Sequence, residues 1–177
     1  MKKKYSSKTS LEVLVCVALL IALQVVLSRF LSIAMWNMKI GFSFIPVVIA
    51  ARLFGPLGAM AVYGIGDVIG ALLFPTGAYF PGFTASAVLS GLIYGIFLWK
   101  KCGPVRITFA VILNQLICSF FLNSLWISIA YGANFTSQLA VRWPQSLGMG
   151  IVQIVLMIVA LERICKPIEK MIYKFRA

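Results

Sequence analysis

Six apolar segments of nearly membrane-spanning length follow one another along the chain, and this pattern constrains the fold more than any other feature. A helix needs about 20 predominantly apolar residues to cross the roughly 30 Å hydrocarbon layer of a bilayer. The segments cover residues 11–30, 40–51, 56–74, 83–99, 105–129 and 146–161. Hydrophobic residues make up 62% of the 177 positions, against about 45–50% in soluble domains. We therefore predict an all-α integral membrane bundle of six transmembrane helices.

Segment 40–51 is too short to cross the bilayer by itself, and Pro46 interrupts it, so we expect a kinked or partly buried helix there. Segment 11–30 follows a basic start, as a secretory signal does, but it is too long for a signal core and lacks a small-residue cleavage pattern. We expect a retained first helix. No repeat or flexible linker divides the chain, which predicts a single transmembrane domain over residues 1–177.

Turn dipeptides lie between several segments, at Gly55-Pro56, Pro75-Thr76-Gly77 and Gly103-Pro104. The basic residues also gather between segments and at the termini. If the N-terminus is cytoplasmic, 13 of the 16 Lys and Arg face the cytoplasm, and only Arg29, Lys39 and Arg142 lie on the other side. This bias predicts a multi-pass protein of the cell membrane with both termini cytoplasmic.

The formal net charge of +12 would suggest a nucleic-acid partner in a soluble protein. Here the bases follow the predicted topology instead, so we expect the lipid bilayer as the partner and no nucleic acid. The chain has no histidine, and its four cysteines, at positions 16, 102, 118 and 165, form no CxxC pair. We therefore predict free thiols, no metal site, no bound cofactor and no catalytic residue, so that the protein is not an enzyme.

A carboxylate, Asp67, lies in the interior of the apolar segment 56–74. A charged side chain at the centre of a membrane helix costs about 2.5–3.5 kcal/mol on insertion scales, so it faces the bundle interior or a water-filled cavity. Helical spacing puts Tyr63, Gly66 and Gly70 on the same face as Asp67. A second polar stripe at a similar depth comprises Ser119, Asn123, Trp126 and Ala130. The two stripes together predict a cavity.

Aromatic and cationic residues are expected to surround the mouth of this cavity. The loops supply Trp36, Lys39, Tyr79, Phe80, Phe83, Arg142, Trp143 and Gln145, and Arg29 lies at the top of the first segment. These residue types suit a flat heteroaromatic ligand that bears carboxylates, because aromatic rings stack on its faces and cations hold its anionic tail. Alternatively, Asp67 pairs with Arg29 in a structural ion pair, and the aromatic residues form an interfacial belt.

Small residues recur one helical turn apart, at Gly66 and Gly70 and at Gly91 and Gly95. This spacing favours close helix packing within the bundle over a dimer face. Ala18 and Ala22 have the same spacing on the first segment. They permit another helix to approach closely, either within the bundle or in a partner protein.

The stretch KIGFSFIPVVIAARLFGPLGAMAVYGIGDVIGALLFPTGAYFPGFT at residues 39–84, GLIYG at 91–95 and NSLW at 123–126 resemble the substrate-binding S components of energy-coupling factor (ECF) vitamin transporters, most closely the folate-specific members. The resemblance implies a six-helix S-component fold in a bacterial plasma membrane. It also implies that the protein captures folate outside, joins the transmembrane coupling protein EcfT and two ATPase subunits, and topples in the membrane to release folate inside. The chain lacks a GxxxxGK[ST] motif, so ATP would be used by the partners.

Taken with the predicted cavity, the resemblance assigns Asp67 to the pterin N–H groups and Asn123 to further hydrogen bonds. Its remaining candidate substrate-binding residues are Tyr63 and Gln145, the stacking residues Trp36, Tyr79, Phe83 and Trp126, and the cations Arg29, Lys39 and Arg142. Ala18 and Ala22 match a motif that contacts the coupling subunit in this family. The sequence leaves open an S component for riboflavin or thiamine, and, in another class, a membrane scaffold protein.

Overall fold

The computed structural model describes residues 7–35, 38–75, 79–99, 103–132 and 134–176. For residues 7–10, 33–35, 38–40, 141 and 160–176 it describes the backbone alone. The elements in chain order are α1 (Ser7–Arg29), β1 (Ile33–Met35), β2 (Met38–Ile40), α2 (Phe44–Leu73), α3 (Pro81–Leu98), α4 (Pro104–Asn114), the π-helix η1 (Gln115–Leu122), α5 (Asn123–Tyr131) and α6 (Phe135–Arg176). Within these residues, five helical stretches are long and apolar enough to cross a membrane. The all-helical bundle is thus confirmed, with one short antiparallel hairpin, β1–β2, added to it.

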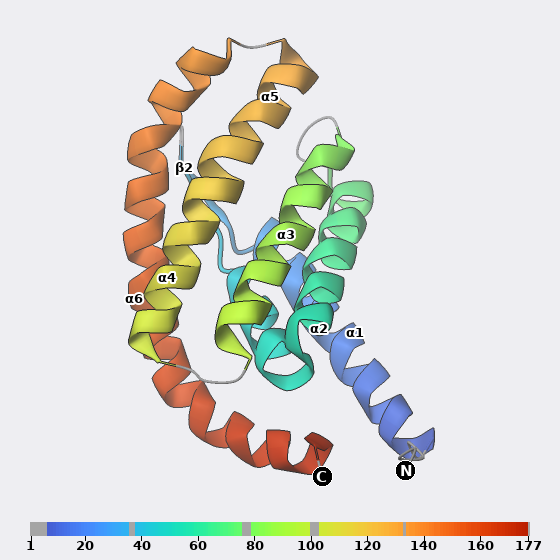
Figure 1. Cartoon of the computed structure of the whole chain (residues 1–177). Coiled ribbons are helices and arrows are strands. Elements are labelled where there is room, and N and C mark those ends of the chain that lie inside the picture. Colours follow the sequence, from blue (N-terminus) through green and yellow to red (C-terminus); the bar gives the residue numbers. More distant parts are fainter. Residues whose placement is uncertain (1–6, 36–37, 76–78, 100–102, 133, 177) are drawn as a thin grey trace.

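Helix α2 consists of two limbs that meet at Gly55. Gly55 has a φ of 77° and a ψ of −162°, which a residue with a side chain rarely adopts. Pro56 follows it and has no N–H group to continue the helical ladder. Figure 1 shows the first limb running towards one end of the bundle and the second limb turning back along α3. Because the limbs correspond to segments 40–51 and 56–74, the structure contains the six predicted helical segments.

Of the two alternatives predicted for segment 40–51, a kinked helix or a partly buried one, the second is confirmed, and no kink occurs at Pro46. Helix α2 begins at Phe44, so Pro46 lies in the first helical turn, where its missing N–H group interrupts no helical hydrogen bond. The break lies nine residues later, at Gly55. The first limb is nevertheless short and largely buried, as expected from its length, and Val47, Ala50 and Ala51 are each fully buried.

Helices α2 and α3 pack closely because α3 presents glycines at the contact. A Cβ atom at Gly91 would lie 2.6 Å from the carbonyl oxygen of Ala59, and a Cβ atom at Gly95 would collide with Pro56. The buried Arg52 adds a polar contact at the end of α3, where its Nη1 donates to the carbonyl oxygens of Leu98 and Trp99. The predicted role of these small residues in packing within the bundle is therefore confirmed.

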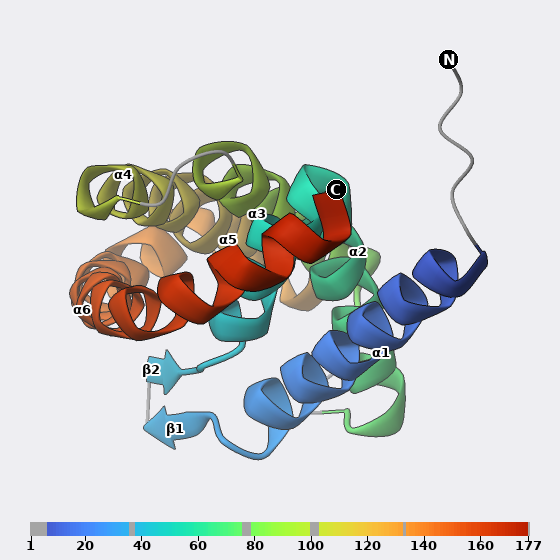
Figure 2. The same ribbon diagram turned by 90° about the horizontal axis from the view of Figure 1, so that it is seen from below.

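The last two spans differ from the sequence-based expectation. Elements α4, η1 and α5 form one continuous rod that begins at Pro104 and ends before Gly132, whose φ of 66° terminates the helix. Helix α6 begins at Phe135, earlier than the predicted residue 146. Arg142, Trp143 and Gln145 consequently lie on a helix and not in a loop. Figures 1 and 2 show that the C-terminal part of α6 curves across the end of the bundle where α1 begins.

We call this end of the bundle the terminal end, and the opposite end the mouth end. At the mouth end α1, α2 and α5 finish, at Arg29, Leu73 and Tyr131, and α3 and α6 begin. The bundle interior contains small and aliphatic side chains, whereas large apolar side chains such as Leu57, Val105 and Ile151 are exposed on its outside. An apolar exterior is what a helix bundle in lipid requires.

Candidate functional site

A cavity of about 670 Å³ lies between the helices and extends from the mouth end into the bundle. This volume falls within the range of about 300–1,000 Å³ that is usual for small-molecule sites. The lining residues come from every helix and also from the segment that precedes α2. They are Gln24, Ser28, Arg29, Gly41, Ser43, Phe44, Tyr63, Asp67, Ala71, Pro75, Tyr79, Phe80, Phe83, Ser86, Ala87, Ser90, Asn114, Gln115, Cys118, Ser119, Asn123, Ile127, Tyr131, Arg142, Met149 and Gln153.

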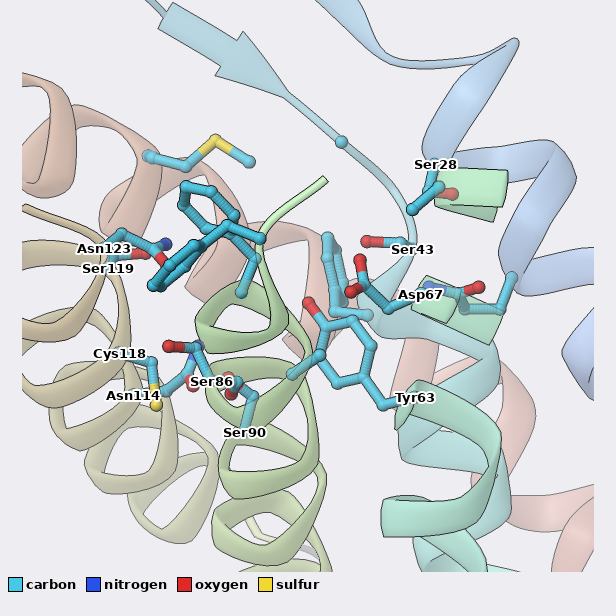
Figure 3. A pocket seen from close by; sticks show the side chains of 18 of the residues that line it. Ser28, Ser43, Tyr63, Asp67, Ser86, Ser90, Asn114, Cys118, Ser119 and Asn123 are labelled. Carbon is cyan, nitrogen blue, oxygen red and sulfur yellow. The ribbon is translucent and has the colours of Figure 1, made fainter. Parts of the chain in front are cut away.

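Asp67 is half-buried on the second limb of α2 and lines the cavity. The hydroxyl of Thr84, on α3, donates a 2.9 Å hydrogen bond to Oδ2 of Asp67, and Thr84 is also 3.2 Å from the hydroxyl of Tyr79. Thr84 was not among the predicted site residues. Because the hydroxyl occupies only one acceptor position of the carboxylate, Asp67 retains the capacity to accept hydrogen bonds from a ligand. Figure 3 shows Asp67 above Tyr63, which lines the same side of the cavity.

Two arginines line the cavity from different helices. Arg29 is the last residue of α1, and its guanidinium lies over Gly70 of α2, where an added Cβ atom would be 2.9 Å from Nε. Gly70 thus leaves room for the arginine. Arg142, on α6, is half-buried, and its Nη1 donates a 3.4 Å hydrogen bond to the carbonyl oxygen of Ser119. The cavity therefore combines one carboxylate with two guanidinium groups.

Aromatic side chains line the cavity near the mouth end. Phe80 and Phe83 contact each other with ring centroids 6.2 Å apart, and Tyr79 and Tyr131 also belong to the lining. Trp126 was predicted to line the cavity, but it is not among the lining residues. Its Nε1 donates to the hydroxyl of Ser86 at 2.9 Å, and its ring lies 5.7 Å from that of Phe80. Trp126 therefore supports the cavity wall from behind.

The π-helix η1 explains why half of the second polar stripe was predicted incorrectly, since Ser119 and Asn123 line the cavity and Trp126 and Ala130 do not. A π-helix has a wider turn than an α-helix, so residues after it are rotated relative to an unbroken α-helical pattern. The stripe that lines the cavity consists of Ser119, Asn123, Ile127 and Tyr131. Ala130, which was predicted on this face, is exposed instead.

The structure thus gathers most of the predicted substrate-binding residues around one cavity, namely Arg29, Tyr63, Asp67, Tyr79, Phe83, Asn123 and Arg142. Gln145 does not line it, because it lies beside the stripe of α6 that carries Arg142, Met149 and Gln153. Trp36 lies outside the described residues. Lys39 lies in β2 opposite Ala34, and only its backbone is described.

The deep end of the cavity contains polar residues that were not predicted. Ser86 and Ser90 of α3 face Asn114 and Cys118 of the α4–η1 rod (Figure 3). Two buried amides lie in this region, Gln115 from η1 and Gln153 from α6, whereas the buried amide of Gln24 on α1 lies against Gly66 of α2. A polar residue in a membrane helix usually faces the bundle interior. That rule would have identified Gln24, Asn114 and Gln115 from the sequence.

The fold and the site define a helical, multi-pass membrane protein with a ligand-sized polar cavity near one end. Comparison with known proteins then gives the family. The family described as "ECF transporter, substrate-specific component" matches residues 12–161. The chain therefore belongs to the substrate-specific components of ECF transporters, a family of transport proteins and not a class of enzymes.

Curated relatives and a solved structure agree with this family. The folate transporter FolT of Clostridium novyi is 42% identical over 122 residues, which cover 68% of this chain and 71% of that protein. FolT of Leuconostoc mesenteroides is 38% identical over 135 residues, 75% of this chain and 69% of that protein. A crystal structure of FolT bound with folic acid superposes with a TM-score of 0.75 at 36% identity, covering 81% of this chain and 88% of the other.

Proposed function

We propose that this chain is the folate-binding S component of an ECF importer, and that it forms a single transmembrane domain. The observation that carries the proposal is the cavity that combines Asp67 with Arg29 and Arg142 in a protein 36% identical to a FolT whose structure contains folic acid. Folate joins a neutral pterin, rich in N–H donors, to a benzoyl group and a dianionic glutamate. A carboxylate complements the first part, and guanidinium groups complement the last.

In the proposed complex Asp67 accepts hydrogen bonds from the pterin amino group and ring N–H, and Asn123 adds amide hydrogen bonds. Tyr63 lies beside Asp67, and Tyr79 and Phe83 stack against the ligand's rings. Support for these roles comes from their shared position on the cavity wall. The proposal places the glutamate carboxylates against Arg29 and Arg142. Trp36 and Lys39 remain predicted contributors, whereas Trp126 contributes through Ser86 and Phe80.

The proposed transport partners are the transmembrane protein EcfT and two ATPase subunits, which would supply the ATP hydrolysis. Ala18 and Ala22 support a contact with EcfT because both are exposed on α1, one turn apart, so that another helix could approach closely. In this proposal the bundle topples as one body in a bacterial plasma membrane and carries the cavity from outside to inside. The terminal end then faces the cytoplasm, as the distribution of basic residues indicates.

The proposal is tested by identifying the molecule that the protein retains. The chain is purified in detergent after incubation of membranes with equal concentrations of folate, riboflavin and thiamine, then desalted and denatured. We expect the released material to show a pterin absorbance at about one equivalent per chain. Release of riboflavin or thiamine instead would assign another vitamin, and release of none would favour a scaffold role.

A further inference from the structure

Gln24 of α1 places a buried amide on the cavity wall without giving it a partner in the protein. Gln24 is 2% exposed and lines the cavity, as does Ser28 one helical turn later. Within the part of the chain that the structure describes, neither Oε1 nor Nε2 of Gln24 forms a hydrogen bond. A buried polar group without a partner lowers the stability of the folded state, so its presence requires an explanation.

Gly66 of α2 determines which end of this amide is available. A Cβ atom at Gly66 would collide with Oε1 of Gln24, so the amide oxygen lies directly on the glycine backbone. The hydrogens on the glycine Cα make weak contacts with an oxygen, whereas an amide nitrogen in its place would bury two unpaired N–H groups. Oε1 is shut off from solvent, but Nε2 is not. The amide therefore offers the cavity a donor.

The donor lies beside Asp67 on the cavity wall. Gly66, against which Gln24 packs, directly precedes Asp67 in α2. Figure 3 shows Ser28, one turn after Gln24 on α1, on the same side of the cavity as Asp67. This part of the wall thus places a carboxylate, which accepts hydrogen bonds, next to an amide nitrogen, which donates them.

The hydroxyl groups around this point cannot discriminate as the amide does. Ser28, Ser43 and Tyr63 also line the cavity near Asp67 (Figure 3). A hydroxyl group rotates and acts as a donor or as an acceptor, whichever the ligand requires. Because Oε1 of Gln24 is held against Gly66, its amide presents N–H groups alone. Gln24 is therefore suited to distinguish an acceptor from a donor on the ligand.

The aminopyrimidinone ring of folate has a polar edge on which two donors are followed by an acceptor. The 2-amino group and N3–H are the donors, and the carbonyl oxygen at position 4 lies next to N3–H. In the proposed complex Asp67 accepts hydrogen bonds from both donors, so the carbonyl oxygen requires a donor beside the carboxylate. Aminopterin, the 4-amino analogue of folic acid, carries N–H groups at this position instead.

We propose that Nε2 of Gln24 donates a hydrogen bond to the 4-carbonyl oxygen of the pterin and thereby selects 4-oxo over 4-amino pterins. The inference rests on the proposed function. The amide, which is unpaired in the empty cavity, gains its partner when the ligand binds, so the full hydrogen bond contributes to affinity. With a 4-amino pterin, N–H groups would face N–H groups, and this repulsion excludes the wrong ligand.

The experiment titrates folic acid and aminopterin by calorimetry into the wild type, Gln24→Met and Gln138→Met. Methionine has a similar length and no N–H group, and the substitution removes no hydrogen bond from the protein because Gln24 makes none within the described residues. Gln138, on α6 and outside the cavity lining, is the matched control. Aminopterin also lacks N3–H, but this difference is the same in every variant. The change in the affinity ratio therefore reports on Gln24.

We expect the wild type and Gln138→Met to bind folic acid at least about fivefold more tightly than aminopterin. Gln24→Met should bind folic acid about 3- to 12-fold more weakly than the wild type, and aminopterin no more weakly. Without ligand, Gln24→Met should melt no lower than the wild type, because an unpaired buried amide has been removed. A substitution that merely loosened the fold would lower the melting temperature and weaken both ligands equally.

A wild type without a preference for folic acid would overturn the inference, as would a folded Gln24→Met protein with an unchanged affinity ratio. In both cases folate binding itself would stand. A wild type that binds neither ligand would instead overturn the proposed function, and the inference with it. If Gln24→Met fails to fold, Gln24→Leu makes the same comparison.

Discussion

Replacing Asp67 tests the assignment on which the binding geometry depends. Each hydrogen bond to a charged group contributes about 1.5–3 kcal/mol, and the proposed contact contains two. Asp67 is half-buried, so water can replace part of the lost interaction. We therefore expect Asp67→Ala to weaken folate binding by about 2–4 kcal/mol, which corresponds to roughly 30- to 700-fold in the dissociation constant.

Two milder substitutions, Thr84→Val and Asp67→Asn, should weaken folate binding less than Asp67→Ala does. Thr84→Val keeps the shape of the side chain but removes the 2.9 Å hydrogen bond that orients Oδ2 of Asp67. Because this bond orients the carboxylate and does not itself contact the ligand, we expect its loss to weaken binding by only about 0.5–1.5 kcal/mol, so the affinity should fall by roughly 2- to 12-fold. Asp67→Asn should lie between the two, because it retains one acceptor oxygen and turns an N–H group towards the ligand's donors.

The assay is calorimetric titration of folate into each purified variant, with a thermal unfolding curve for each as a control on the fold. The expected order of affinities is wild type, Thr84→Val, Asp67→Asn and Asp67→Ala, from tightest to weakest. If folded Asp67→Ala binds folate as tightly as the wild type, the assignment of the pterin to Asp67 is wrong, and the carboxylate serves the structure of the bundle.

Three further predictions follow from the packing. Gly91→Ala should destabilise the protein by about 1–3 kcal/mol in thermal unfolding, because its Cβ atom would lie 2.6 Å from the Ala59 carbonyl oxygen. Gly103→Ala, whose Cβ atom would meet no atom within 4 Å, should cost less, and only because Gly103 is the N-cap of α4; equal effects of the two substitutions would exclude the packing argument. Arg52→Met should lower stability by about 2 kcal/mol, since two carbonyls at the end of α3 lose their donor; an unchanged melting curve would show that these contacts are dispensable. The double variant Ala18→Leu, Ala22→Leu should bind folate normally but lose most vesicle uptake with the coupling module, and normal uptake would place the coupling contact elsewhere.

The sequence predicted the elements whose signals are local. Gly55-Pro56 marks the junction of the two limbs of α2, and Gly103-Pro104 marks the start of α4, because glycine and proline impose backbone constraints of their own. The paired glycines of α3 predicted close packing for a similarly direct reason. Pro46 was misinterpreted because proline breaks a helix only in its interior, and the start of α2 was predicted four residues too early.

The parts of the site that were missed depend on features that spacing alone does not reveal. The π-helix η1 rotates Trp126 away from the cavity and turns Ile127 and Tyr131 towards it, and the 3.6-residue spacing used for the prediction takes no account of such a wider turn. Thr84 carries no signal in sequence, because an isolated threonine in an apolar helix is common. Asn114 and Gln115 do carry one, since adjacent amides within a membrane segment indicate an interior polar group.

The central claim is that this cavity binds folate. Its most direct test is titration of folate into the purified wild-type chain in detergent, with riboflavin and thiamine titrated under the same conditions. The account predicts tight binding of folate alone, with one molecule per chain and without any partner subunit. Binding of riboflavin or thiamine in preference to folate, or no binding of any of the three by a folded protein, would contradict it.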